Sequence, residues 1–291
     1  MTKIMIIILQ LIFFIAAAPL LSGLISKIKN NIRMRKGQGI LQPYYNLAKL
    51  FLKREVISET ASWIFRAAPF VVLASMLVSA LLIPVFVSRS PVNQAGDFLA
   101  LIFIFALGRF FLSLAALDAG SSFGGMGSSR EMFISSLVEP AFCLAIFAVS
   151  LQSGSTDISS LNSGNVISVS SIVAAITLFL VTIAETSRIP VDNQETHLEL
   201  TMVHEAMILE YSGRSLALIE MASYIKQMIL FLLIARIVFP AYLAVGIFII
   251  AVVVALVEVS VAKMRLFRVA DFLGLAFVLG VVASVCAILG V

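Results

Sequence analysis

Ionisable side chains are concentrated in one stretch of this otherwise apolar sequence. The segment from Glu185 to Arg214 contains six carboxylates, two arginines and both histidines of the chain, His197 and His204. Such groups can transfer protons, hold metals or bind a partner through their charge. The HExxH metal spacing is absent because Ile208 stands where the second histidine would be, and no serine or cysteine is placed as a nucleophile beside a histidine. The segment therefore favours docking of another protein over covalent or metal chemistry.

A second group of ionisable side chains lies within or at the margins of long apolar runs. Its members are Arg109, Asp118, Glu139, Glu185, Glu220, Lys226, Arg236 and Glu258. An unpaired charge in hydrocarbon costs about 2.5–3.5 kcal/mol or more, so such residues mark ion pathways or paired networks. Glu139 precedes Pro140 in mid-span, where a proline can kink a helix, and we expect its carboxyl to be buried. The pattern favours a proton or ion relay, with pairs that only lock helices together as the alternative.

The elements that carry these residues are membrane-spanning helices. The sequence is 61% hydrophobic and 12% charged, and apolar runs of about 18 residues or more recur, each long enough to cross ~30 Å of hydrocarbon as a helix. This composition excludes a soluble protein. It predicts an all-α polytopic integral membrane protein with about eight transmembrane helices in a single membrane domain, 1–291. The expected spans are 4–25, 67–88, 98–118, 131–151, 166–186, 215–238, 241–262 and 270–290.

The distribution of basic residues predicts the orientation. The formal net charge is +4, but the basic side chains border the spans and form no stripe with aromatic residues, which excludes nucleic-acid binding. The predicted loops on one side of the membrane contain only two basic residues, Lys3 and Arg89. All other loop lysines and arginines lie on the opposite side. By the positive-inside rule, both termini lie outside and the loops 26–66 and 187–214 face the cytoplasm. We expect a multi-pass protein of the cytoplasmic (inner) membrane of a prokaryote.

The cysteines exclude a redox centre built from this chain alone. Cys143 and Cys286 both lie in predicted spans, and no CxxC motif occurs. Iron–sulfur clusters and structural zinc sites need several cysteine or histidine ligands at short spacing. We therefore expect no cofactor in this chain.

Two inner loops carry further local signals. Residues 39–55 have helical amphipathic spacing after Pro43 and predict an interfacial helix, which either lies in the headgroup plane or docks a cytoplasmic partner. Residues 120–131, "GSSFGGMGSSRE", suggest a phosphate loop, but no strand precedes them and no GK[ST] follows. Their glycines instead predict close packing of helix ends.

The docking segment itself is expected to form a helix. Pro190 ends the fifth span, and Asp192 with Glu195 resembles a capping box for a helix from about Asn193 to Gly213. On that helix the histidines share one face with Tyr211, within roughly 80°, and the acidic residues gather opposite. The candidate docking residues, with their neighbours on the inner loops, are Arg130, Arg188, Asp192, Glu195, His197, Glu199, His204, Glu205, Glu210 and Tyr211.

Four motifs resemble those of a known family. "GILQPYYNLAKLFLKRE", "SSREMFISSLVEP", "AETSRIPVD" and "LEYSG" are similar to motifs of respiratory NADH dehydrogenase subunit 1, the complex I subunit beneath the quinone site. Within that superfamily, "RIPVDNQETHLELTMVHEAMILEYSG" resembles the branch of formate hydrogenlyase, hydrogenase-4 and related [NiFe] hydrogenases. The complex I branch typically has "PFDLPEAEQEL" at the position of "PVDNQETHLEL", and this departure puts a quinone site in doubt.

The resemblance implies partners and roles. It implies that 187–214 docks a peripheral arm, made of hydrogenase large and small subunits and an iron–sulfur protein, whose [NiFe] centre and clusters lie in those other chains. It also implies antiporter-like membrane subunits alongside. Glu139 and Glu185 match the family's acidic positions. The roles assigned to Glu220, Lys226 and Glu258 are based only on their positions within the predicted spans. The relay candidates are Glu139, Glu185, Asp118, Arg109, Glu220, Lys226 and Glu258.

The expected function is therefore a membrane connector that couples redox chemistry in the docked arm to proton or sodium translocation. One alternative is the quinone-site membrane subunit of a complex I-like dehydrogenase, or a phenazine-reducing relative. A stand-alone secondary transporter is another, although paired broken helices from an internal repeat are not apparent. A passive anchor is the third, and the charges within the spans disfavour it.

Overall fold

The computed structural model describes residues 3–58, 61–86, 97–159, 168–193 and 202–290, and within these ranges the chain is almost entirely helical. The helices are α1 (Lys3–Ile32), α2 (Gln42–Leu52), α3 (Trp63–Leu82), α4 (Phe98–Asp118), α5 (Ser122–Ser153), α6 (Val169–Glu185), α7 (His204–Ile208), α8 (Gly213–Val238), α9 (Leu243–Ser260) and α10 (Leu266–Leu289). An isolated bridge between Asp97 and Asp157 is the only β pairing among the described residues. The predicted all-α fold is confirmed.

The membrane-spanning helices match the predicted spans. Within the part of the chain that the structure describes, seven helices are long and apolar enough to cross a bilayer, namely α1, α3, α4, α5, α8, α9 and α10. The eighth predicted span corresponds to α6, which is apolar but only 17 residues long. Its length is about 26 Å at 1.5 Å per residue, slightly less than the hydrocarbon thickness. The chain is an integral multi-pass membrane protein.

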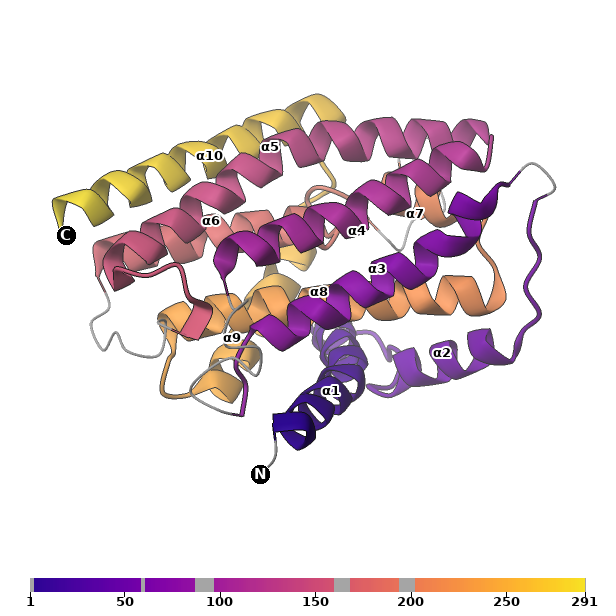
Figure 1. The fold of residues 1–291 in the computed structure, drawn as a ribbon, viewed down its shortest axis with the longest axis horizontal. Helices are drawn as coiled ribbons and strands as arrows, with labels where there is room; N and C mark the ends of the chain where they lie inside the picture. Colours follow the sequence, from indigo (N-terminus) through magenta and orange to yellow (C-terminus); the bar gives the residue numbers. More distant parts are fainter. Residues whose placement is uncertain (1–2, 59–60, 87–96, 160–167, 194–201, 291) are drawn as a thin grey trace.

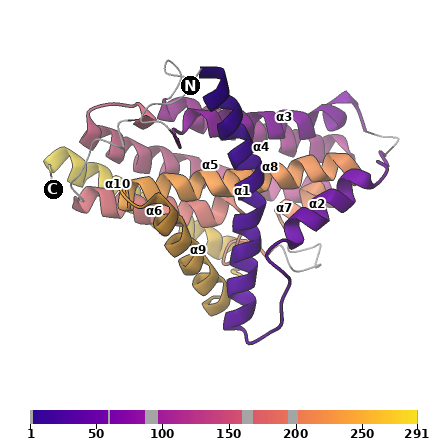
Figure 2. The same ribbon diagram turned by 90° about the horizontal axis from the view of Figure 1, so that it is seen from below.

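Helix α8 occupies the middle of the bundle. It packs against α1, α2, α3, α6 and α9, while α5 packs against α4, α6, α7 and α10. In Figure 1, α10, α5 and α4 form one side of the molecule, and α3 and α8 lie beneath them. Figure 2 shows α1 crossing α8. Because α8 is covered on most sides, its polar side chains must find partners inside the protein.

The loops that the sequence predicts to face the cytoplasm converge at one end of the bundle. The start of α3, the end of α4, the start of α5, the short α7 and the start of α8 lie together in Figure 1. The predicted amphipathic helix is present as α2 and packs on α1 and α8. The α9–α10 connection joins the same region, because the Met264 amide donates to the carbonyl of Pro190 over 2.9 Å. The docking segment is thus in contact with several inner connections.

The glycine-rich stretch 120–131 packs as predicted. It forms the first turns of α5, and a Cβ atom on Gly124 would lie 2.5 Å from the carbonyl oxygen of Ala116. A Cβ atom on Gly127 would lie 3.0 Å from both the Ala206 Cβ and the Val203 carbonyl oxygen. Glycine therefore allows α5 to approach the end of α4 and the α7 segment.

The predicted helix from Asn193 to Gly213 is wrong. Asn193 is not helical, and α7 covers only His204–Ile208. Gly213 begins α8 with φ of +54° instead of ending a helix, and a Cβ atom there would lie 2.8 Å from the Arg54 carbonyl oxygen. The physical reason is that tertiary contacts, not a continuous helix, satisfy this polar segment. Glu195, His197 and Glu199 lie outside the described residues, as does Thr201.

Candidate functional site

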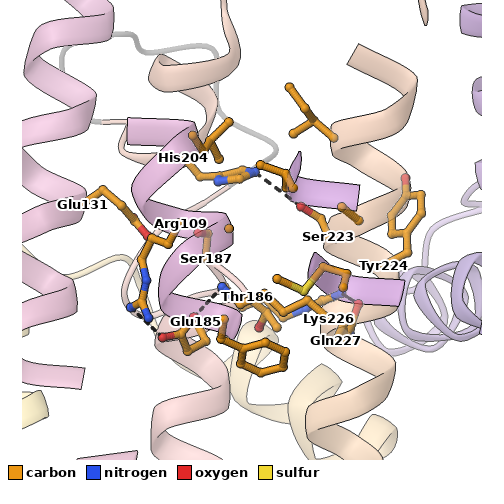
Figure 3. A pocket seen from close by; sticks show the side chains of 18 of the residues that line it. Arg109, Glu131, Glu185, Thr186, Ser187, His204, Ser223, Tyr224, Lys226 and Gln227 are labelled. Carbon is orange, nitrogen blue, oxygen red and sulfur yellow. Dashed lines mark hydrogen bonds and ion pairs between the residues drawn. The ribbon is translucent and has the colours of Figure 1, made fainter. Parts of the chain in front are cut away.

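Four of the predicted relay residues meet in one charge cluster between α4, α5, α6 and α8. Arg109 of α4 donates through Nη1 to the Oε1 of Glu185, the last residue of α6, over 2.8 Å. Its Nη2 lies 3.1 Å from the Oε1 of Glu139 on α5. The ammonium of Lys226 on α8 pairs with the second oxygen of Glu185. We call Arg109, Glu139, Glu185 and Lys226 the central cluster, and Figure 3 shows Arg109, Glu185 and Lys226 of it.

The cluster is anchored in the protein but reaches its surface. Arg109 and Glu185 are buried, and Gly108 lies next to Ser75 of α3, so that α4 packs closely there. The side chain of Glu139, in contrast, is 41% exposed. The expectation that Glu139 is buried is wrong for the single chain, because its carboxyl contacts Arg109 at the surface of the protein. Arg109 therefore links an enclosed carboxylate to one at the subunit surface.

A cavity adjoins the central cluster. Its walls enclose about 730 Å³ of space unfilled by protein atoms, including space open to the surface, and Arg109, Glu185 and Lys226 all line it. Glu131, His204 and Ser223 line it as well. Figure 3 shows the His204 ring directed towards Ser223, and the side chain of Glu131 beside Arg109. Most of the lining surface is apolar, and the polar side chains among the lining residues offer hydrogen-bond partners for water.

Glu131 was missed by the sequence reasoning, which treated 120–131 as a packing segment. A usable signal existed, because Glu131 stands eight residues before Glu139 on the same helix. At 100° per residue this spacing places the two carboxyls roughly 80° apart around α5. The Glu131 carboxyl faces the cavity, and the Glu139 carboxyl contacts Arg109 at the protein surface.

A second charge cluster surrounds Glu258 of α9. Its carboxylate lies 3.2 Å from the Nζ of Lys29 on α1 and 2.5 Å from the Nη1 of Arg188 in the docking segment. Arg188 also donates through Nη2 to the Oε1 of Gln227 over 3.0 Å. Sequence reasoning assigned Glu258 and Arg188 to different roles, and the structure brings them together. Because Lys226 and Gln227 are neighbours on α8, the two clusters are adjacent.

Asp192 organises the docking segment from its buried position. Its carboxylate pairs with the Nζ of Lys263 over 2.6 Å. It also accepts from the backbone amides of Val203 and His204 over 3.0 and 3.2 Å, and therefore caps α7. Asp192 was expected to cap a helix at Asn193, and it caps this later one instead.

The remaining predicted residues lie apart from the central cluster. Asp118 accepts from the amides of Ser62 and Phe65 at the start of α3, over 2.8 and 3.3 Å. The Tyr211 hydroxyl donates to the Phe65 carbonyl over 2.9 Å, and its ring stacks on the Phe65 ring with centroids 4.0 Å apart. The Asp118 contacts fasten the start of α3 to the end of α4, and the Tyr211 contacts fasten it to the docking segment. Three more residues complete the placement: Arg130 donates to the Met202 carbonyl, Arg236 donates to the Pro84 carbonyl, and Glu220 is partly buried on α8.

Two ionisable groups in the first turn of α7 favour their neutral forms. Burial lowers the pKa of His204, although the nearby Glu205 opposes this shift. Burial raises the pKa of the Glu205 carboxyl, with the charge of His204 acting in the opposite direction. Among the described residues, no group of three or more His, Cys, Asp or Glu side chains is arranged to hold a metal ion. The chemistry that this site offers is acid–base and electrostatic.

Comparison with known proteins identifies the family. The family described as NADH dehydrogenase matches residues 3–289. The chain belongs to the NADH dehydrogenase subunit 1 family. It is 34% identical over 225 residues to hydrogenase-4 component C of Escherichia coli (strain K12), covering 76% of this chain and 70% of that protein. Formate hydrogenlyase subunit 4 of the same organism is 31% identical over 283 residues, with 89% and 90% covered.

More distant relatives confirm the wider relationship. NADH-quinone oxidoreductase subunit 8 of Rhodothermus marinus is 27% identical over 219 residues, covering 70% of this chain and 62% of that protein. A chain of the membrane-bound sulfane sulfur reductase, an archaeal respiratory membrane complex, has the same fold, with a TM-score of 0.87 over 99% of this chain and 100% of that one. Its sequence identity is 18%, so this likeness concerns the fold alone. The resemblance inferred from the motifs is confirmed.

Proposed function

We propose that this chain is the membrane connector of a respiratory-type hydrogenase complex similar to formate hydrogenlyase. In this role it docks a peripheral arm whose [NiFe] centre and iron–sulfur clusters lie in other chains, and it couples redox chemistry there to translocation of protons or sodium. The hydrogenase relatives, at 34% and 31% identity, support this branch over the NADH-quinone oxidoreductases at 25–28%. In this proposal the chain serves an oxidoreductase complex and binds no redox group itself.

The observation that carries the proposal is the position of Arg109 between two carboxylates. Arg109 contacts the enclosed Glu185 and the 41% exposed Glu139 with different nitrogens. A carboxylate exposed to hydrocarbon is costly, so Glu139 needs a neighbouring membrane subunit to cover it. Protonation of Glu185 would weaken its ion pair with Arg109, and Arg109 would then bind Glu139 more strongly. This shift of charge at Glu139 would act on the neighbouring membrane subunit.

The docking segment supplies the link to the arm. Arg188 and Asp192 are held by Glu258 and Lys263, while Glu205 and Glu210 are partly exposed at the inner end of the bundle. A shift of the segment would act on Arg188 and, through the adjacent Lys226 and Gln227, on Glu185. We infer that the inner end faces the cytoplasm and that both termini lie outside, as the basic residues predict.

Purification and vesicle assays test this function together. The complex is extracted from native membranes in mild detergent and its subunits are identified, and we expect hydrogenase subunits and antiporter-like membrane subunits to co-purify. In inverted vesicles supplied with reduced viologen, hydrogen production should be accompanied by uptake of protons or sodium. A complex that contains no hydrogenase subunit would contradict the proposal, and so would hydrogen production without ion uptake in sealed vesicles.

Charge reversal tests the docking role separately. Glu210→Lys, and the same change at Glu195 or Glu199, should detach the arm from washed membranes. The loss should grow with salt concentration because exposed charges are screened. Asp271→Lys, at an exposed acidic residue of α10, is the matched control. Equal retention of hydrogenase activity on all washed membranes would rule out this segment as the docking site.

A further inference from the structure

We propose that His204 is the intake group through which protons reach the central cluster, and that Glu131 is the first carboxylate to receive them. This inference rests on the proposed function and deepens it by naming the entrance of the pathway. Neither residue takes part in the ion pair of Arg109 with Glu185, so the proposed proton entrance is distinct from the central cluster. Its parts are the α7 segment, the cavity and the first turns of α5.

The first observation is that three contacts hold α7 against the cavity. The Asp192 carboxylate accepts from the backbone amide of His204 over 3.2 Å. Arg130 donates to the carbonyl of Met202 over 3.0 Å, just before α7 begins. A Cβ atom at Gly127 would lie 3.0 Å from the Val203 carbonyl oxygen, so α5 and the α7 segment pack closely there. These contacts hold the short helix α7 in place, and the Asp192 hydrogen bond holds His204 directly.

The second observation is what the imidazole faces. The Nε2 of His204 lies 3.5 Å from the Oγ of Ser223 on α8. Ser223 stands three residues before Lys226, so both side chains lie on one side of α8, and both line the cavity. His204 itself is partly exposed. It therefore connects the surface of the docking segment to the cavity wall that carries the central cluster.

The third observation is the place of Glu131. Gly127 and Glu131 are one helical turn apart on α5, so the carboxyl emerges beside the contact with α7. Figure 3 shows it beside Arg109, on the opposite side of the cavity from Ser223 and Tyr224. It lines the same cavity as His204, and water molecules can bridge the space between them. The Glu131 carboxylate is a proton acceptor, and the cations Arg109 and Lys226 line the same cavity.

The transfer conserves every proton. Neutral His204 accepts a proton on one ring nitrogen from water at the docking surface and releases one from the other nitrogen towards Ser223 or a cavity water. The Ser223 hydroxyl likewise accepts on its oxygen and releases its own hydrogen. Glu131 accepts the proton and becomes a carboxylic acid. Loss of its negative charge leaves Arg109 and Lys226 to act more strongly on Glu185, and no electron transfer is involved.

The alternative role for His204 is a structural contact that only orders the docking segment. The two roles differ in what a histidine substitute must do. Glutamine at 204 retains hydrogen bonding, but it cannot accept a proton near neutral pH. Glycine at 204 leaves space that free imidazole can fill. A structural role predicts loss of arm attachment, whereas an intake role predicts loss of ion uptake with the arm attached.

The experiment uses the whole complex in sealed inverted vesicles, with hydrogen production from reduced viologen and proton uptake measured together. We expect His204→Gln and Glu131→Gln to reduce uptake per hydrogen at least about tenfold while the arm stays bound. Imidazole should restore uptake in His204→Gly, and the rescued uptake should slow in D₂O because proton transfer then limits it. Asp271→Asn, which removes an exposed carboxylate from α10, should behave like wild type.

Each other outcome overturns the inference in a recognisable way. Wild-type uptake in His204→Gln vesicles means that protons enter elsewhere. Joint loss of uptake and arm attachment, with no rescue by imidazole, assigns His204 to docking. Hydrogen production without ion uptake in the wild type contradicts the coupling function itself and removes the need for any intake. Because wild-type vesicles are measured first, failure of the intake and failure of the function are distinguished.

Discussion

Arg109 binds two carboxylates of opposite exposure, Glu185 over 2.8 Å inside the bundle and Glu139 over 3.1 Å at its surface. A guanidinium has a rigid fork of donors, so one arginine can bridge two carboxyls without changing its own charge. Lys226 holds the other oxygen of Glu185, and the three helices α4, α6 and α8 are thereby fixed around one carboxyl. The balance of charge at Arg109 depends on the protonation of both carboxyls.

The first prediction concerns Glu139. Glu139→Gln keeps the shape and a hydrogen bond to Arg109 but removes the ionisable group. We expect the complex to assemble and to lose ion uptake in the vesicle assay, with slower turnover. Uptake and hydrogen production like those of the wild type would show that Glu139 is only a structural partner. Failure to assemble would instead support the alternative in which the charges lock helices together.

The second prediction concerns Arg109 itself. Arg109→Ala leaves Glu185 with Lys226 alone and removes the described partner of Glu139. Breaking a buried pair costs roughly 3–5 kcal/mol because a charge remains uncompensated. We expect a large fall in the thermal stability of the purified complex, measured by size-exclusion chromatography after heating in detergent. Arg109→Lys keeps the charge but cannot bridge both carboxyls, so it should fall between Ala and wild type. Equal stability of the three proteins would contradict the bridging role.

The third prediction compares two glycines of α5. An alanine Cβ at Gly127 would lie 3.0 Å from the Val203 carbonyl oxygen, whereas nothing lies within 4 Å of one at Gly125. In a helix interior alanine is favoured over glycine by about 1 kcal/mol. Gly125→Ala should therefore leave the protein unchanged or more stable. Gly127→Ala should displace α7 and increase proteolysis of the docking segment. The same cleavage rate in both variants would show that α7 is not held by this contact.

The span positions were predictable from sequence because hydrophobic length is a local property. The ends of α4 agree with the expected 98–118, and most other span ends differ by a few residues. The ion pairs were not predictable, because partner choice depends on how each helix is rotated. Asp118 and Glu139 both looked like relay residues, yet Asp118 accepts backbone amides of α3 while Glu139 meets Arg109. The helix predicted from Asn193 to Gly213 was wrong because Asp192 pairs with Lys263 and Gly213 packs against the Arg54 carbonyl. A local sequence pattern does not reveal such tertiary contacts.

The fourth prediction concerns orientation. In a chain with Cys143 and Cys286 replaced by serine, single cysteines are introduced at Asn193 and Ser163. Asn193 follows the docking segment's buried Asp192, and Ser163 belongs to a predicted outer loop. A membrane-impermeant maleimide should label position 163 in intact cells and position 193 only in inverted vesicles. Labelling of position 193 from outside in intact cells would reverse the proposed topology.

The last prediction concerns Glu258, which lies between the cations Lys29 and Arg188 at 3.2 and 2.5 Å. Glu258→Gln removes the negative charge and leaves two buried cations facing each other. We expect a loss of stability of roughly 3–5 kcal/mol, because an uncompensated buried charge is more costly than an absent pair. Arg188→Gln in the same chain removes one of the two cations. The double variant should therefore be more stable than Glu258→Gln alone, and the difference gives the coupling energy of the pair. Additive losses, measured by heating the detergent-purified complex, would show that the two side chains do not depend on each other. The docking segment would then be held to the α9–α10 connection by the Asp192–Lys263 pair and the Met264–Pro190 hydrogen bond, without a contribution from Glu258.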